Sequence, residues 1–176
     1  MPSRLKRYYG QRDLHFITFS CYEQRPLLDT PLARDVFVKV LAVMRLRYKF
    51  RLVGYVVMPD HVHLLISEPE IGNPSIVLKA LKHRVSAELR ERRRADQRSP
   101  QRSSTISRVK ILPRFWQPRF YDFNVYTSAK HKEKLEYMHT NPLTRKQVEH
   151  AGDWIWSSYL FYETGRQGII PIDPVD

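Results

Sequence analysis

The chain has 176 residues, a formal net charge of +12 and 42% hydrophobic residues. This length predicts one domain with its own core, and the hydrophobic content excludes a mainly disordered chain. No apolar run reaches membrane-spanning length, no signal-type leader follows the basic N-terminus, and the single Cys21 excludes an internal disulfide. We therefore expect a cytoplasmic protein that makes no contact with a membrane.

The first elements in chain order are a strand and a helix. Residues 14–24 alternate and are rich in β-branched and aromatic side chains, which predicts a strand. A helix is predicted over residues 31–50, because Pro31 follows Thr30, a suitable N-cap, and apolar residues recur at helical spacing. Those residues are Val36, Val40, Val43 and Leu46.

A hairpin and a second helix follow. Residues 51–58 and 61–67 are apolar runs separated by Pro59-Asp60, which predicts two strands joined by a tight turn. The second helix is predicted from about residue 74 to about residue 94, with its basic residues outward. Its inward residues are expected to be Ile76, Leu78, Leu81, Val85 and Leu89.

The last third of the chain predicts a connection, a strand and a third helix. Residues 95–110 shift to Arg, Ser and Gln, which indicates a flexible basic connection, and residues 115–125 predict a strand. The third helix is predicted over residues 128–141, capped by Thr127 or Ser128. We expect it to end at Asn141-Pro142, because a residue before proline is pushed out of the helical region. A C-terminal tail is expected from about residue 143.

The order of these elements is β-α-β-β-α-β-α, without an internal repeat. That order predicts the α+β class, with a ferredoxin-like antiparallel sheet and helices packed on one face. We expect residues 1–176 to form a single domain.

Positive charge is concentrated in the middle of the chain. Between Lys79 and Arg119 there are thirteen Lys or Arg against three acids, so this stretch carries +10 of the net +12. Such a block indicates a surface for a polyanion. The alternative is a solvated, partly disordered basic loop. The two interpretations are compatible, because basic loops often order only on nucleic acid.

A histidine pair lies inside the predicted hairpin. Side chains alternate along a strand, so His61 and His63 project to the same face, while Val62 and Leu64 face the other way. Two imidazoles at such positions can converge on one divalent ion. The alternative is a pair of unrelated, hydrogen-bonded core histidines.

The third predicted helix carries candidates for the missing partners. With residues about 100° apart, Tyr137 and Asn141 lie on one side with Lys130 and Lys134. The opposite side looks like the packing side and carries His131, Leu135, Met138 and His139. A phenol is a poor nucleophile until its anion is stabilised, which a metal ion and lysines could do. Tyr137 is therefore a candidate for attack on a phosphate.

At these residues the chain resembles a known family. "DHVHLLI" resembles the His-hydrophobic-His motif of the HUH nucleases, and "EYMHTNPL" resembles the helix of the single-tyrosine insertion-sequence 200/605 transposases. Together with "FWQPRFYD" and "DWIWSSY", the chain is most similar to the REP-associated tyrosine transposases. The likeness extends from about Tyr8 to Tyr162.

The resemblance implies an activity and the residues for it. It implies a single-strand DNA endonuclease and strand transferase that cleaves at hairpin-forming repeats through a 5′-phosphotyrosine. Tyr137 would be the nucleophile, and His61, His63 and Asn141 would bind Mg²⁺ or Mn²⁺. Many relatives have a glutamine where this chain has Asn141. We expect a monomer, with a homodimer as the alternative, because both occur among the relatives.

Single-stranded or hairpin DNA is the expected partner. We expect Lys and Arg to hold the backbone and Trp116 or Phe120 to stack on bases. The Gly-Thr-Pro-Ser motif that often recognises a guide sequence in the subgroup is missing from residues 8–19. The expected DNA contacts are Lys79, Lys82, Arg84, Arg92, Arg93, Arg94, Arg114, Trp116, Arg119, Phe120, Lys130 and Lys134.

Three other classes of protein remain as alternatives. A domesticated DNA-binding module would keep the fold without cleavage, and a relaxase or replication-initiator nuclease would share the chemistry. Histidine-triad nucleotide hydrolases also use closely spaced histidines. They need a further histidine where this chain has Leu65, which argues against that class.

Overall fold

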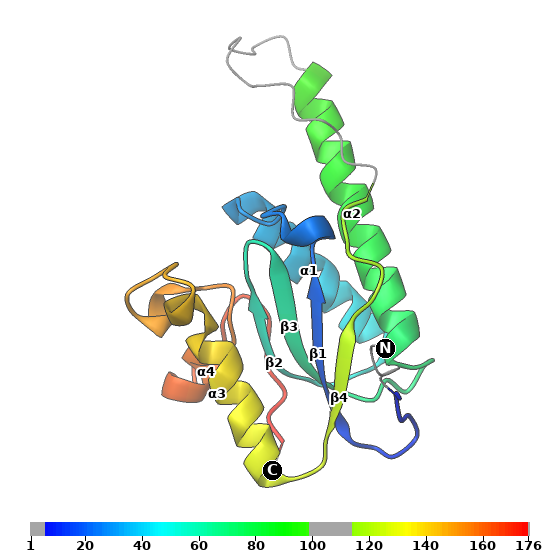
Figure 1. The fold of residues 1–176 in the computed structure, drawn as a ribbon, viewed down its shortest axis with the longest axis vertical. Helices are drawn as coiled ribbons and strands as arrows, with labels where there is room; N and C mark the ends of the chain where they lie inside the picture. Colours follow the sequence, from blue (N-terminus) through cyan, green and yellow to red (C-terminus); the bar gives the residue numbers. More distant parts are fainter. Residues whose placement is uncertain (1–5, 99–113, 176) are drawn as a thin grey trace.

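The structure, a computed structural model, describes residues 6–98 and 114–175. Its centre is a four-stranded antiparallel sheet in the order β2-β3-β1-β4 (Figure 1). The strands are β1 (Leu14–Ser20), β2 (Leu52–Val57), β3 (His61–Ser67) and β4 (Tyr121–Val125). The helices are α1 (Pro31–Tyr48), α2 (Pro74–Arg98), α3 (Ser128–Thr144) and α4 (Tyr159–Thr164), with short 3₁₀ turns at Tyr22–Gln24 and Ala151–Asp153.

Helices cover both faces of this sheet. Along β1, Ile17 packs into the core formed with α1 and α2, while its neighbour Phe16 packs with Leu135 of α3. The α+β class, the antiparallel sheet and the element order are confirmed. The expected packing on one face holds for α1 and α2, whereas α3 lies on the other face. The reason is that every residue of β2 is buried, so both sides of this strand need a cover.

Two threonines cap helices as the sequence predicts. The Thr30 side chain accepts a hydrogen bond from the Ala33 N–H at 3.2 Å, and Thr127 accepts one from the Lys130 N–H at 3.1 Å. The predicted end of the third helix is wrong, because α3 continues through Pro142 to Thr144. The Arg145 N–H still donates to the Asn141 carbonyl at 2.9 Å, so the chain remains coiled past the proline.

The inward faces of α1 and α2 differ in part from the predicted ones. Val43 and Leu46 of α1 and Ile76 of α2 are exposed. The core instead takes the side chains of Phe37, Leu41, Met44 and Val77. Helix α2 also runs beyond residue 94, so residues 95–98 of the predicted connection are helical and the rest of it lies outside the described residues.

A glycine in β2 sets how closely α3 approaches the sheet. A Cβ at Gly54 would lie 2.7 Å from Leu135 Cδ2 and 2.8 Å from Met138 Cε. Because only hydrogen occupies that space, α3 can rest directly on β2 and carry Tyr137 to the neighbouring strand. Across residues 6–98 and 114–175, no helix is long and apolar enough to span a membrane.

Candidate active site

Two buried imidazoles lie side by side at the start of β3. Both face α3, and their ring centroids are 4.8 Å apart. His61 is 7% exposed and His63 is 3% exposed. The pattern of β3 explains this placement, because the intervening Val62 packs in the core on the opposite face.

Each imidazole has a different partner at Nδ1. His61 Nδ1 lies 2.6 Å from Asp60 Oδ1, so it donates its N–H to the carboxylate. His63 Nδ1 lies 2.7 Å from the hydroxyl of Thr18, which is its directly paired neighbour on β1. An Nδ1–H that donates leaves Nε2 with a lone pair. Both histidines are thereby held in the tautomer that can bind a metal ion through Nε2.

Helix α3 adds an amide and a phenol to this pair. Asn141 Nδ2 lies 3.2 Å from His63 Nε2, while Asn141 Oδ1 is buried with no hydrogen-bond partner among the described residues. The Tyr137 ring lies edge-on to His63, with ring centroids 5.3 Å apart and an interplanar angle of 73°. Tyr137 is 52% exposed, so DNA can reach it from solvent. Asn141 departs from the face that the sequence predicts, because it is buried towards β3.

The surroundings of His63 keep it neutral. Burial lowers the pKa of His63 to about 3, and electrostatic interactions with His61, Arg145 and Lys134 lower it further. Phe16 stacks on the imidazole at 5.5 Å with an interplanar angle of 15°. Lys134 Nζ in turn lies 5.0 Å from the centroid of the Phe16 ring. A neutral imidazole can bind a metal ion, and the Lys134 ammonium, which pairs with Glu133 Oε1 at 3.6 Å, adds a positive charge nearby.

The donor set fits a divalent ion. It consists of two imidazole nitrogens and one amide, whose buried Oδ1 has no hydrogen-bond partner among the described residues. No cluster of three His, Cys, Asp or Glu with metal-ligand placement occurs in the described part of the chain, and the Asn141 amide is the group that could add a third donor to the histidine pair. Imidazole and amide groups can bind a divalent ion, and Mn²⁺ or Mg²⁺ would require additional oxygen donors such as phosphate and water.

The comparisons with known proteins agree with this arrangement. Residues 9–141 match the family model described as "Transposase IS200 like", a segment that contains both histidines, Tyr137 and Asn141. The chain belongs to this family. It is therefore a transposase, an enzyme that cleaves and transfers DNA. The predicted resemblance to the insertion-sequence transposases is confirmed.

Of three similar proteins, two extend the match over nearly the whole chain. A REP-associated tyrosine transposase of Escherichia coli K12 is 25% identical over 97% of this chain and 90% of its own. A putative REP-associated tyrosine transposase of Haemophilus influenzae is 30% identical over 72% of this chain and 67% of its own. A solved REP-associated transposase bound to a REP hairpin has a TM-score of 0.67 at 20% identity, covering 99% and 92% of the two chains, and shows the same fold.

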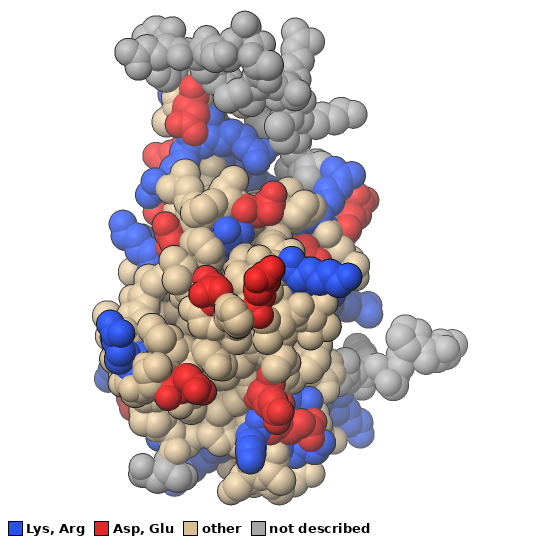
Figure 2. All heavy atoms as spheres, turned by 90° about the vertical axis from the view of Figure 1, so that its left-hand side faces the viewer, with Lys and Arg blue, Asp and Glu red and all other residues tan. Residues whose placement is uncertain are grey.

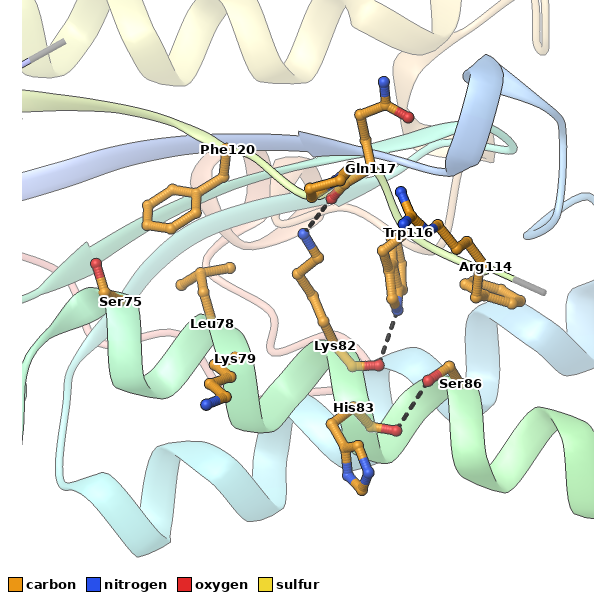
Figure 3. Close-up of a pocket in the computed structure, with 12 residues that line it drawn as sticks. Ser75, Leu78, Lys79, Lys82, His83, Ser86, Arg114, Trp116, Gln117 and Phe120 are labelled. Carbon is orange, nitrogen blue, oxygen red and sulfur yellow. Dashed lines mark hydrogen bonds between the residues drawn. The ribbon is translucent and has the colours of Figure 1, made fainter. Parts of the chain in front are cut away.

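Most of the expected DNA contacts lie away from the histidine cluster of this transposase. Lys79, Lys82, Arg114, Trp116 and Phe120 line a pocket between α2 and the segment before β4 (Figure 3). The rest are distributed as follows: Arg84, Arg92, Arg93 and Arg94 are exposed on α2, Arg119 is exposed beside the pocket, and Lys130 and Lys134 lie on α3. Near the histidines, only Lys134 offers a positive charge from this set.

Two of these residues have roles in the protein itself. Trp116 is buried against Phe19 and Phe37, and its Nε1–H donates to the Lys82 carbonyl at 2.8 Å, so its ring does not offer a free stacking surface. Lys130 Nζ lies 2.8 Å from Glu133 Oε2, in a pair on the exposed side of α3. Phe115 and Phe120 are the other aromatic residues that line the pocket.

Four residues at the site were missed by sequence reasoning. Asp60 stands directly before His61, and Thr18 pairs with His63 only after β1 and β3 come together. Phe16 stacks on His63 from β1, and Arg145 adds its charge from the end of α3. Of these, only Asp60 had a signal in the sequence, because a carboxylate next to a ligand histidine often orients it.

Proposed function

We propose that this transposase cleaves single-stranded DNA at hairpin-forming repeats, with Tyr137 as the nucleophile and a divalent ion held by His61, His63 and Asn141. One observation carries the proposal. Tyr137 and Asn141 come more than 70 residues after His63 in the sequence. In the structure the Asn141 amide nitrogen lies 3.2 Å from His63 Nε2, and the half-exposed Tyr137 ring packs edge-on against the same imidazole. A solved relative is bound to a REP hairpin, which supports hairpin DNA as the substrate.

The reaction follows from these positions. The Tyr137 oxygen attacks the scissile phosphorus, its proton leaves to solvent, and the bond from phosphorus to the 3′ oxygen breaks. The products are a 5′-phosphotyrosine and a free 3′-hydroxyl, which takes up a proton. Attack by a second 3′-hydroxyl reverses these steps and joins the strands without a nucleotide cofactor. When bound, the ion polarises the phosphate and stabilises charge on its oxygens.

The protein's own side chains prepare this step. Thr18 and Asp60 hold the imidazoles in one tautomer, and Lys134 places a positive charge near the site. The Phe16 ring packs against both His63 and Tyr137, with its centroid 6.1 Å from the phenol ring, and so limits the positions of the nucleophile. Because one copy supplies all four proposed site residues, we further propose that a monomer is active.

The nucleophile can be tested by trapping the covalent intermediate. Wild-type protein, Mn²⁺ and a 5′- or 3′-labelled hairpin DNA should give a protein–DNA adduct that survives denaturing electrophoresis. Tyr137→Phe should abolish the adduct, because the ring remains but the attacking oxygen is gone. Tyr126→Phe is the matched control, since Tyr126 is also exposed and should keep wild-type adduct formation. An adduct that persists in Tyr137→Phe would contradict the assignment. No adduct with the wild type would favour a DNA-binding module without cleavage.

A further inference from the structure

Helix α2 is longer than its packing requires. Its buried residues end at Val85, while residues 91–98 are exposed and project beyond the sheet (Figure 1). An isolated helical end is marginal in water, and packing in the core does not account for the length of this one. The exposed side chains are largely charged, with five Arg between Arg90 and Arg98.

The charges on α2 are sorted by side. With residues about 100° apart, five basic residues fall within about 60° of one direction. They are Lys79, Lys82, Arg90, Arg93 and Arg94, and we call them the α2 stripe. The acids Glu88, Glu91 and Asp96 all lie about 100° or more from the centre of that stripe. Arg92 lies on the other side, with its guanidinium 3.5 Å from Glu88. The stripe thus presents one sign of charge over roughly 22 Å of helix from Lys79 to Arg94.

A pocket lies at the N-terminal end of the α2 stripe. It has a volume of about 440 Å³ and lies between α2 and the segment Arg114–Phe120 (Figure 3). Lys82 Nζ reaches across it to the Gln117 carbonyl at 2.6 Å, which uses one of its three donors. Phe120 lines the same pocket, and the Arg7 guanidinium carbon lies 3.8 Å from its ring centroid. An aromatic ring beside lysine and arginine is the chemistry that holds an unpaired base and its phosphate.

This surface is distinct from the candidate active site. The pocket packs on the α1 and α2 side of the sheet, where Lys82 Nζ lies 5.8 Å from the centroid of the Phe19 ring. Tyr137 and the histidine pair lie on the α3 side, against Phe16. Over the side of the body that Figure 2 shows, basic and acidic side chains are mixed and no basic stripe of this kind is visible.

We propose that a single-stranded run of the substrate DNA lies along the α2 stripe, with one unpaired base in the pocket beside Phe120. The charge pattern favours one strand over a duplex. A helix inside a duplex groove faces phosphates on both flanks, and here the flanks carry Glu91 and Asp96. A single backbone needs positive charge on one side only. The proposal rests on the proposed function only in that DNA is the ligand.

The test compares two triple variants on the same helix. Lys79→Gln/Arg93→Gln/Arg94→Gln removes three charges from the stripe. Arg84→Gln/Arg92→Gln/Arg98→Gln removes three charges from the other sides of α2, so the net charge is matched. Arg84 and Arg92 are expected DNA contacts from the sequence alone, but they lie off the stripe and outside the proposed path of the strand. Binding of a fluorescent, unstructured oligothymidine and of a blunt-ended DNA hairpin is measured by anisotropy over a range of salt concentrations, with no divalent ion present.

The stripe variant should bind oligothymidine about tenfold or more weakly, and its salt slope should fall by about 2. The matched variant should change the affinity less than about threefold. An equal loss of oligothymidine affinity in both variants, or no loss in either, would contradict the proposed binding of DNA along the α2 stripe. A stripe variant that loses the blunt hairpin as much as oligothymidine would overturn the single-strand assignment. Since Tyr137→Phe should bind oligothymidine like wild type, a failure of the stripe is distinguishable from a failure of the nucleophile.

The pocket has its own measurement. An oligothymidine that carries 5-iodouracil should photo-crosslink to Phe120 or the adjoining residues, and Phe120→Leu should reduce that crosslink severalfold. Tyr8→Leu is the control, because Tyr8 is an exposed aromatic residue outside the pocket. Crosslinks that map to α3 instead would place the base elsewhere and refute the pocket assignment.

Discussion

Two buried histidines on opposite faces of the central sheet show how neighbours decide what an imidazole does. On the α1 and α2 side, His15 is fully buried, with Nδ1 2.8 Å from Asp122 Oδ1 and Nε2 3.4 Å from Glu68 Oε1. On the α3 side, His63 has a hydroxyl and an amide as partners. Both rings are equally hidden from water, yet one is enclosed by carboxylates and the other by neutral groups.

The difference appears in the charge that each ring carries. Burial by itself lowers the pKa of His15, but the hydrogen bonds and charges of Asp122 and Glu68 together raise it above its usual value. Burial lowers the pKa of His63 to about 3, and no carboxylate opposes this effect as Asp122 and Glu68 do at His15. A carboxylate on each nitrogen makes His15 part of an internal ion cluster. Neutral partners leave His63 a lone pair, which a metal ligand needs.

The largest expected effect separates the two histidines by function. We expect His63→Leu to reduce formation of the covalent DNA adduct by about 10³-fold, because an electrostatic stabiliser of the reacting phosphate is lost. We expect His15→Leu to retain the adduct under conditions where the variant is folded. The rate of adduct formation with Mn²⁺ and labelled hairpin DNA measures both. An equal loss of adduct formation in the two folded variants would show that His15 and His63 do not differ in function.

The second expectation is that His15→Leu lowers stability more than His63→Leu does, although its effect on the adduct is smaller. His15→Leu should lower the free energy of unfolding by about 3–5 kcal/mol, because Asp122 stays buried without its partner. His63→Leu should lower it by only about 1 kcal/mol, because its bonds are between neutral groups. Urea unfolding followed by tryptophan fluorescence compares the two. A greater loss in His63→Leu would mean that the carboxylates do not stabilise the fold through His15.

The His15 cluster also predicts the direction of a pH effect. A histidine whose pKa is raised in the folded state adds stability below its unfolded pKa of about 6.5 and loses it as pH rises through the folded pKa. The loss of unfolding free energy caused by His15→Leu, measured by urea unfolding, should therefore be larger at about pH 6 than at about pH 9. A cost that grows with pH would contradict the charged state of His15.

A fourth expectation concerns how the ligand histidines are held. Asp60→Asn should weaken Mn²⁺ binding about 10- to 100-fold, because the amide no longer fixes the His61 tautomer as a carboxylate does. Titration of free Mn²⁺ by electron paramagnetic resonance measures this without DNA or turnover. Asp153→Asn, an exposed carboxylate on a 3₁₀ turn, is the control and should bind like wild type. Unchanged binding in Asp60→Asn would remove Asp60 from the metal site.

The smallest expected effect concerns the α2 stripe. Burial lowers the pKa of Lys82 to about 8, with a partly opposing effect from Cys21. Lys82 is therefore charged below that pH and loses its charge above it. Affinity for oligothymidine should fall a few-fold from about pH 7 to about pH 9, and the salt slope should fall by about 0.7. Lys82→Met should show neither change, and a persisting change would assign the titration to another group.

The fold was largely predictable from local patterns, and its errors have local causes. Turn residues and caps such as Pro59-Asp60 and Thr127 mark boundaries that depend on a few neighbouring residues. The end of α3 was not predictable, because Asn141 and Pro142 are buried and tertiary packing holds the last turn against the cost of the proline. The inward residues of α1 were partly wrong, because contact with the sheet and α2 turns the buried face towards Phe37, Leu41 and Met44 and away from Val43 and Leu46.

The candidate site was also predictable only in part. Residue type and spacing in the sequence single out His61, His63, Tyr137 and Asn141, because alternation along a strand and the helical repeat act over a few residues. Only the tertiary structure decides that Asn141 turns inward, that Thr18 meets His63, and that Trp116 belongs to the core. Those outcomes depend on which face of the sheet α3 covers and on the close approach that Gly54 permits. Such contacts join segments far apart in the chain, and no local pattern encodes them.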